Sequence, residues 1–322
     1  MPDMLKKILV LFIIILVVSC NQKTGTEEKI EAIELDLQVI RFEQEFAGTD
    51  PRQLPELKQK YPFLFPEQFP DSVWIEKLSD SLQLEINQAV EEEFSDFTTQ
   101  ENELYALFQH INYYFPEFEI PAVITVTSEV DYKNKIIYAE DYLFVSLDTY
   151  LGTDHPFYTG LQNYLKKNFK KDQIVVDAAE EIAKKYVPGP DSRTFLSHMV
   201  YYGKIQYLKE VWLPTLDPAR RIGYTKAEYD FAEANESQIW RYFVENELIY
   251  DTDNQLQTRF LYPAPFSKFY LQLDAESPAR LGQYIGLEIV KAYMDKNDVS
   301  LSRMLKTSAE EIFNNANFKP RK

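Results

Sequence analysis

Two side chains near the middle of the chain, His198 and Tyr202, have the spacing of a metal site on a helix. They lie four residues apart in the segment His198-Met-Val-Tyr-Tyr202 and would therefore share one helix face. Two zinc-binding histidines have this spacing in the H-E-x-x-H motif, in which the glutamate is the general base. Here Met199 stands in place of that glutamate, and a tyrosine stands in place of the second histidine. The segment lacks the base that hydrolysis needs, so we predict a vestigial site or ligand pocket rather than a catalytic centre.

Glu245 is the residue that a later helix could bring to His198 as a further ligand. The simpler interpretation of Glu245 is a surface ion pair with Arg241, one helical turn earlier. His110 and His155 lie on other elements, and Ser197 lacks the G-x-S-x-G setting of an acyl-transfer nucleophile. We therefore expect no catalytic residue, no bound metal and no cofactor, zinc included. An atypical zinc site that contains His198 stays open as the alternative.

The composition excludes several classes of partner. The 322 residues include 51 acidic and 34 basic side chains, which give a net charge of −17. This charge would repel a phosphate backbone, so we expect no nucleic-acid partner. Glycine occurs only nine times, and neither G-x-G-x-x-G nor G-x-x-x-x-G-K-[ST] is present, so we expect no nucleotide either.

The only cysteine, Cys20, follows an N-terminal segment of secretory type. Two lysines precede an apolar run of eleven residues, 8–18, which is too short to span a hydrocarbon core of about 30 Å. The residues Val17-Val-Ser-Cys20 resemble the lipobox of bacterial lipoproteins, in which the signal peptidase cuts before a cysteine that carries lipid. We therefore predict a signal peptide at 1–19, a lipid on Cys20 and a flexible tether over 20–29. Cleavage would change the net charge to −18.

The rest of the chain must position these residues, and we expect it to form one α+β domain over 30–322, with helices dominant around a small β-sheet. Alternating and β-branched residues predict strands at 33–39, 122–127, 135–138 and 142–147. A proline-rich stretch at 51–70 favours irregular structure around at most one short helix. Apolar residues at a period near 3.6 predict helices at 71–94, 99–115, 157–168, 173–187, 191–212, 225–249, 278–296 and 306–314.

Three features of these elements bear on packing. The predicted helix 191–212 carries His198 and is apolar on two faces, which indicates burial on both sides. Gly282 and Gly286 lie on one face of another predicted helix, where they would allow a close approach between helices. The segment 262–270 is rich in aromatic and proline residues and predicts a stiff loop that either lines a binding groove or caps the core.

Several segments taken together resemble the GldB family of gliding-motility lipoproteins of the Bacteroidota. They are the lipobox at Cys20, Arg41-Phe42, Ser146-Leu-Asp-Thr-Tyr-Leu-Gly152, Ser197-His-Met-Val-Tyr-Tyr-Gly-Lys204, Ala234-Asn-Glu-Ser-Gln-Ile-Trp-Arg-Tyr-Phe243, Pro263-Ala-Pro-Phe-Ser-Lys268 and Gly282-Gln-Tyr-Ile-Gly286. The resemblance covers essentially the whole mature chain. It implies a lipid-anchored envelope protein that faces the periplasm and is needed for gliding. Its implied partners are other envelope proteins of the gliding and type IX secretion machinery.

The chain is also distantly similar to a family of predicted zinc proteases, which implies a degenerate zincin-like architecture. Met199 and Tyr202 depart from the motif of that family, so no catalytic residue is carried over. Three functions remain to be weighed: a non-enzymatic partner-binding or assembly component, an atypical zinc metallopeptidase or other envelope hydrolase centred on His198, and a glycan- or peptide-binding lipoprotein. The missing base and second ligand favour the first of these.

Overall fold

The computed structural model describes residues 25–139, 141–272 and 274–321. The predicted signal peptide at 1–19, the predicted lipid-attachment residue Cys20 and the first part of the expected tether, 20–24, lie outside the described residues. Within the described residues, four strands form one sheet in the order β1-β2-β4-β3. The strands are β1 (Val39–Arg41), β2 (Ala122–Val126), β3 (Ile136–Ala139) and β4 (Tyr142–Ser146). The pairs β1·β2 and β2·β4 are parallel, and β3 pairs antiparallel with β4.

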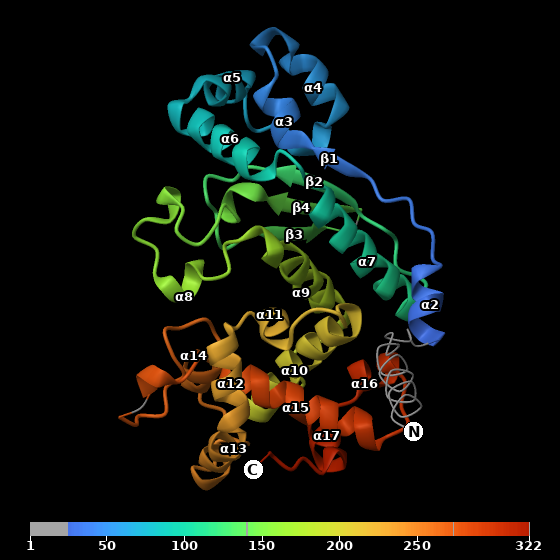
Figure 1. The fold of residues 1–322 in the computed structure, drawn as a ribbon, viewed down its shortest axis with the longest axis vertical. Helices are drawn as coiled ribbons and strands as arrows, with labels where there is room; N and C mark the ends of the chain where they lie inside the picture. The colour runs from blue at the N-terminus through green and yellow to red at the C-terminus, as the bar shows by residue number, and fades with distance from the viewer. Residues whose placement is uncertain (1–24, 140, 273, 322) are drawn as a thin grey trace, which may run out of the picture.

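Side chains alternate between the two faces of this sheet, as the period of a strand requires. One face carries Val123, Leu143 and Val145, which join the main core against α7 (Thr98–Tyr114) and α9 (Ile174–Tyr186). The other face carries Ile40 and Phe144 and is covered by α3 (Phe42–Ala47), α4 (Leu54–Lys60) and α5 (Asp71–Ser79). Helix α6 (Ser81–Phe94) buries Ile86, Val90 and Phe94 in the main core. Figure 1 shows α3 to α6 above the sheet and α7 and α9 on its other side.

The helices from residue 195 onward form a second layer below the sheet (Figure 1). At its centre α10 (Phe195–Trp212) crosses α15 (Leu281–Lys296). Around this pair lie α11 (Pro218–Ile222), α12 (Lys226–Ala234), α13 (Glu236–Glu245), α14 (Gln255–Phe260), α16 (Leu301–Lys306) and α17 (Ala309–Ala316). We call residues 25–187 the sheet half and residues 195–316 the helical half; one apolar core runs through both. The expected helix-dominant α+β class is confirmed, whereas the zincin-like architecture stays a prediction.

The two-faced burial predicted for the helix 191–212 is confirmed in α10. Its buried residues include Phe195 and Ile205 on one side and Met199, Val200 and Gly203 on the other. The prediction of close packing at Gly282 and Gly286 is also confirmed, because a Cβ atom on Gly286 would overlap the main-chain carbonyl of Met199. A Cβ atom on Gly203 would likewise overlap the carbonyl of Gly286. The backbones of α10 and α15 are therefore in direct contact at this crossing.

Several predicted boundaries were wrong. The chain at 33–37 is extended but belongs to no strand, and side chains of α7 bond to its main chain: the Leu35 N–H donates to the Tyr105 hydroxyl (3.0 Å), and Gln109 donates to the Ile33 carbonyl (2.8 Å). Pairing with β2 begins only at Gln38, whose carbonyl accepts a hydrogen bond from the Val123 N–H (2.9 Å). The predicted helix 71–94 is divided at Asp80, whose carboxylate caps α6 through the Gln83 N–H (2.9 Å).

Two further helical predictions and part of the predicted tether need correction. The predicted helix 225–249 is interrupted at Asn235, which separates α12 from α13. The predicted helix 157–168 reduces to α8 (Asn163–Lys166), since Gly160 has a left-handed φ of 89°. Residues 25–29, expected to be flexible, belong to α2 (Gly25–Glu31), where Ile30 is buried and Glu27 lies 3.3 Å from the His110 ring.

Candidate functional site

His198 lies half-buried on α10, and its ring meets the start of α14. Its Nε2 atom is 3.2 Å from the amide nitrogen of Gln257, whose side-chain oxygen accepts a hydrogen bond from the Tyr262 hydroxyl at 2.6 Å. Burial lowers the pKa of His198, which favours a neutral ring that can accept the hydrogen bond from Gln257. Burial also raises the pKa of Tyr202, one turn further along α10, to about 12, so its hydroxyl stays protonated at neutral pH.

The structure therefore groups His198 and Tyr202 with Gln257 and Tyr262. Glu245 does not join this group, because it is exposed at the C-terminal end of α13. Among the described residues, no set of three or more His, Cys, Asp or Glu side chains is placed to hold a metal ion. His198 thus has the surroundings of a half-buried histidine that is hydrogen-bonded to Gln257.

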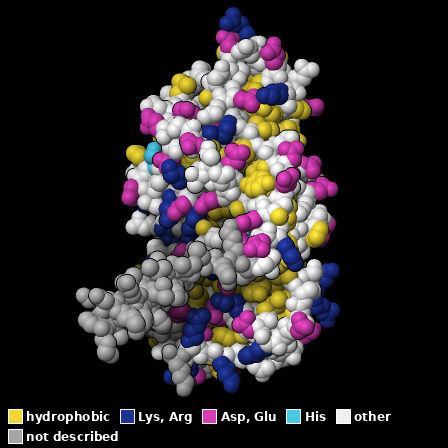
Figure 2. All heavy atoms as spheres, turned by 45° about the vertical axis from the view of Figure 1, so that its right-hand side comes forward, with side chains coloured by type: hydrophobic (Ala, Val, Ile, Leu, Met, Phe, Trp, Pro, Cys, Tyr) yellow, Lys and Arg dark blue, Asp and Glu magenta, His cyan; other side chains and the backbone are white. Residues whose placement is uncertain are grey.

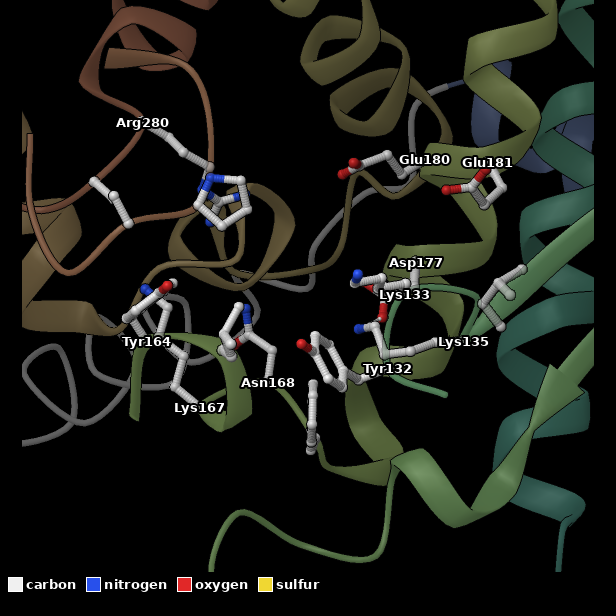
Figure 3. Close-up of a pocket in the computed structure, with 16 residues that line it drawn as sticks. Tyr132, Lys133, Lys135, Tyr164, Lys167, Asn168, Asp177, Glu180, Glu181 and Arg280 are labelled. Carbon is white, nitrogen blue, oxygen red and sulfur yellow. Dashed lines mark hydrogen bonds and ion pairs between the residues drawn. The ribbon is translucent and has the colours of Figure 1, made fainter. Parts of the chain in front are cut away.

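A larger polar site lies where the sheet half meets the helical half. It is a cleft of about 290 Å³, and we call it the charged cleft (Figure 3). Its walls come from the loop before β3, α8, α9, the segment 263–264 and the residues before α15: Tyr132, Lys133, Lys135, Ile136, Tyr164, Leu165, Lys167, Asn168, Phe169, Asp177, Glu180, Glu181, Pro263, Ala264, Ala279 and Arg280. Pro263 and Ala264 belong to the stiff loop 262–270, so this loop does line a groove.

One wall of the charged cleft is acidic and belongs to α9. Asp177, Glu180 and Glu181 are three and four residues apart, so helix geometry places them on one face. Figure 3 shows them together on the α9 side of the cleft. Each carboxylate is paired with a lysine: Asp177 with Lys135, Glu180 with Lys209 at 2.8 Å, and Glu181 with Lys184 at 2.6 Å. The Asp177 carboxylate also accepts a hydrogen bond from the Tyr150 hydroxyl at 2.9 Å.

Lys209 determines the ionisation of Glu180. Burial on its own would raise the pKa of Glu180, but the positive charges of Lys209, Lys184 and Arg280 outweigh burial and hold the pKa well below its usual range. Burial lowers the pKa of Lys209, whose side chain is only 2% exposed, while the pairing with Glu180 opposes that change. Glu180 thus remains ionised and paired with Lys209 at neutral pH.

The opposite wall is basic and is built around Arg280. This residue has a left-handed φ of 60° immediately before α15 and donates from its guanidinium to the Gly223 carbonyl at 2.9 Å. Asn168 donates to the same carbonyl at 3.0 Å. The Tyr224 ring lies 5.5 Å from both the Arg280 guanidinium and the Lys167 ammonium. Lys167 pairs with Glu228 at 2.7 Å, and its pKa is lowered by burial and further by Arg280.

Arg280 differs from Lys135 and Lys167, which are paired with Asp177 and Glu228. Among the described residues, no carboxylate lies within 4.0 Å of the Arg280 guanidinium. Its backbone conformation is rare for a residue with a side chain, and such strain persists only where the surroundings enforce it. Gly223 leaves room for this arrangement, because a Cβ atom there would lie 2.9 Å from the Asn168 amide nitrogen and 3.1 Å from the Arg280 guanidinium. Arg280 is therefore a fixed cation with unused hydrogen-bond donors at the cleft.

Elsewhere on the surface the charges are mixed. On the face drawn in Figure 2, lysine and arginine side chains alternate with aspartate and glutamate side chains, and apolar groups lie between them. The charged cleft differs from this mixture because its three carboxylates lie on the α9 wall, with Lys133 and Lys135 beside them, whereas Arg280 and Lys167 lie on the opposite wall. Such a division can orient a ligand that carries charges of both signs.

Replacing Lys209 with methionine is expected to lower the free energy of unfolding by about 2 kcal/mol, since Glu180 loses a charge-assisted hydrogen bond but keeps Lys184. Chemical denaturation of the full-length protein in detergent measures this change. The ionised Glu180 makes its full contribution to the free energy of unfolding above its ordinary pKa of 4.5. This contribution is lost as the pH falls towards the lower pKa of Glu180 in the folded state. The variant should therefore lose less stability on acidification than the wild type.

Lys226→Met is the matched control for this prediction, because the Lys226–Asp230 pair is exposed on both sides. We expect it to cost no more than about 0.5 kcal/mol. Equal losses in the two lysine variants would contradict a special role for the Lys209–Glu180 pair.

Comparison with known families identifies the chain. The family model described as gliding motility protein GldB matches residues 23–320. The chain belongs to the GldB family. A search of curated proteins and of solved structures finds no match. The family designation is that of a gliding-motility lipoprotein, which indicates a membrane-anchored protein of the cell envelope. In the described part of this GldB-family protein, no helix is both long and apolar enough to cross a membrane.

Proposed function

We propose that this GldB-family lipoprotein is a non-enzymatic binding or assembly component of the gliding and type IX secretion machinery. Its lipid on Cys20 would keep it on a membrane of the cell envelope, facing the periplasm, and the charged cleft would hold a segment of another envelope protein. The observation that carries the proposal is the position of Arg280, a fixed cation that faces the carboxylates of α9 across the cleft.

The chemistry of the cleft favours binding over catalysis. A general acid or base works best when its pKa lies near the operating pH. Glu180 has a pKa well below that range, and each carboxylate of α9 is neutralised by a lysine. His198 is hydrogen-bonded to Gln257, and Met199 replaces the base that a zinc hydrolase would need. The α9 carboxylates are thus held by lysines and His198 by Gln257, which favours a role in binding over one in proton transfer.

The two walls also suit a protein partner. A segment that carries an acidic group could pair with Arg280, while its N–H groups or a basic side chain face α9. Complementary charges of this kind provide specificity and speed up association. The cleft lies between the sheet half and the helical half, so a bound segment would contact both.

Arg280→Gln is expected to abolish or strongly slow gliding while the amount of protein in the envelope stays normal. The variant removes the charge that faces α9, and we expect partner affinity to fall at least about tenfold. Time-lapse microscopy of cells that carry only this variant measures gliding, and immunoblotting of membranes measures the protein level. The control is Arg193→Gln, because Arg193 is exposed and lies outside the cleft. Normal gliding of the Arg280 variant would contradict the proposal.

A further inference from the structure

A second cavity, of about 370 Å³, lies on the opposite face of the sheet from α9. It is open at the ends of β1, β2 and β4 and is partly covered by α3 and α5. We call it the strand-end cavity, and its lining residues are Phe42, Glu43, Phe46, Leu64, Trp74, Lys77, Val126, Thr127, Ser128, Asp131, Asn134, Ile137, Phe144 and Ser146. None of these residues lines the charged cleft.

The position of this cavity is one where ligands often bind. In open sheets, ligands tend to occupy the space beyond the carboxyl ends of parallel strands. Here Phe42 follows β1, Thr127 follows β2, and Ser146 ends β4, and all three face the same cavity. Its volume lies within the range of about 300–1,000 Å³ that is usual for small-molecule pockets.

The polar end of the cavity is held in place by a buried carboxylate. Asp148 has no exposed surface and accepts hydrogen bonds from the N–H groups of Ser128 at 3.0 Å and Val130 at 2.6 Å. Val130 itself and Glu129, the residue between Ser128 and Val130, have left-handed φ values of 60° and 55°. This conformation is a true outlier for a β-branched valine, and such strain tends to occur at functional sites.

The charged groups around the cavity already have partners within the chain. Glu43 pairs with Arg41 at 2.6 Å, and Lys77 pairs with Glu129 at 3.1 Å. The Asp131 carboxylate accepts a hydrogen bond from the Asn134 amide at 2.8 Å. A charged ligand would have to displace one of these interactions, whereas a neutral ligand would leave them intact.

The other walls are apolar and mostly aromatic. Phe42, Phe46, Leu64, Trp74 and Phe144 line the cavity, and Ile137 lies at its mouth with 46% of its surface exposed. An engineered apolar cavity of about 150 Å³ is known to hold benzene, so the strand-end cavity has room for about two rings. The cavity therefore combines apolar walls of that size with a polar end whose charged groups are already paired.

We propose that the strand-end cavity binds a neutral amphipathic small molecule. Its aromatic or branched hydrocarbon part would lie against Phe42, Trp74 and Phe144. Its hydroxyl or amide head would form hydrogen bonds with the polar groups of Ser128, Asn134 and Ser146. This inference does not depend on the proposed role of the charged cleft.

The experiment uses photolabelling of the purified full-length lipoprotein in detergent. The probe is trifluoromethyl-diazirinyl benzyl alcohol, which has an aromatic body and a neutral hydroxyl head. We expect saturable labelling of peptides that line the strand-end cavity, suppressed by excess phenylethanol. The corresponding benzoic acid, which differs by its negative charge, should label these peptides at least about tenfold less.

Ile137→Trp is the blocking variant, because it places a larger side chain at the mouth of the cavity from an exposed position on an edge strand. We expect it to reduce labelling at least about tenfold, since the ring of the probe loses its buried site. Leu82→Trp is the matched control, because Leu82 is 47% exposed and lies outside the cavity. This control should label as the wild type does.

Three results would overturn the proposal. The first is labelling that does not saturate or that is equal in the Ile137→Trp variant. The second is equal labelling by the alcohol and the acid, which would exclude selection for a neutral head. The third is labelling of the purified protein but not of the same protein in intact cells, which would show that a partner protein fills the cavity.

Discussion

Gly286→Ala is expected to lower the free energy of unfolding by about 3 kcal/mol or more. On helix propensity alone, alanine would stabilise α15 by roughly 1 kcal/mol. The contact with α10 reverses the sign, because the new methyl group would overlap the main-chain carbonyl of Met199. A backbone group cannot rotate away as a flexible side chain can, so the two helices must move apart. Chemical denaturation of the full-length protein in detergent measures the loss.

Gly189→Ala provides the control for this variant, because nothing lies within 4 Å of the position that its Cβ atom would take. It should change the stability by no more than about 0.5 kcal/mol. A Gly286 variant that is as stable as the wild type would show that α10 and α15 are not in backbone contact. A shift of α15 would also displace Arg280, which immediately precedes it, so we expect the variant to impair gliding as well.

Cys20→Ala is expected to abolish incorporation of labelled fatty acid and to release the protein from membranes. Without the thiol there is no attachment point for lipid, and each buried CH₂ of an acyl chain contributes about 0.8 kcal/mol to anchoring. The apolar run at 8–18 is too short to replace the lipid as a membrane span. The strong negative charge of the chain also opposes adsorption to anionic headgroups.

Metabolic labelling with palmitate and carbonate extraction of membranes measure these two effects. Asn21→Ala is the control, because it alters the adjacent residue and leaves the thiol in place. It should retain the label and the membrane association. Label on the Cys20→Ala protein would contradict lipid attachment at this residue.

Local signals made several elements predictable from the sequence. Thr225 and Glu228 have the residue types and the three-residue spacing of a capping box, and both reciprocal hydrogen bonds are present at the start of α12. The apolar faces of α10 and the glycines of α15 correctly indicated burial and close packing, because these properties follow from side-chain size and helix period alone. The strands β2, β3 and β4 were likewise evident from their β-branched and aromatic residues.

The sequence did not reveal features that depend on tertiary partners. The chain at 33–37 alternates like a strand, yet side chains of α7 bond to its backbone at Ile33 and Leu35. The amphipathic pattern of α12 and α13 runs across Asn235, so periodicity alone could not show the break. Residues 25–29 lack large apolar groups, and their helix is stabilised by Ile30, which packs into the core, and by the contact of Glu27 with His110.

The charged cleft was beyond sequence analysis for a similar reason. Its walls come from segments around residues 132–136, 164–169, 177–181 and 263–280, which are distant along the chain. In isolation, Asp177, Glu180 and Glu181 have the pattern of a solvated helix face. Arg280 resembles any arginine near a helix start, and only the contacts with Gly223 and Tyr224 distinguish it. His198 attracted attention through its spacing, but its hydrogen bond to Gln257 could not be foreseen.

The most direct test of the account is site-specific photo-crosslinking from the charged cleft in gliding cells. A photoreactive amino acid at Tyr164, which lines the cleft, should give one discrete adduct with another envelope protein. Adding Arg280→Gln should reduce this adduct at least about tenfold. The same amino acid at Tyr250, which is 57% exposed and lies outside the cleft, should not give it. An adduct that persists with Arg280→Gln, or that forms equally from Tyr250, would contradict a partner held in the charged cleft.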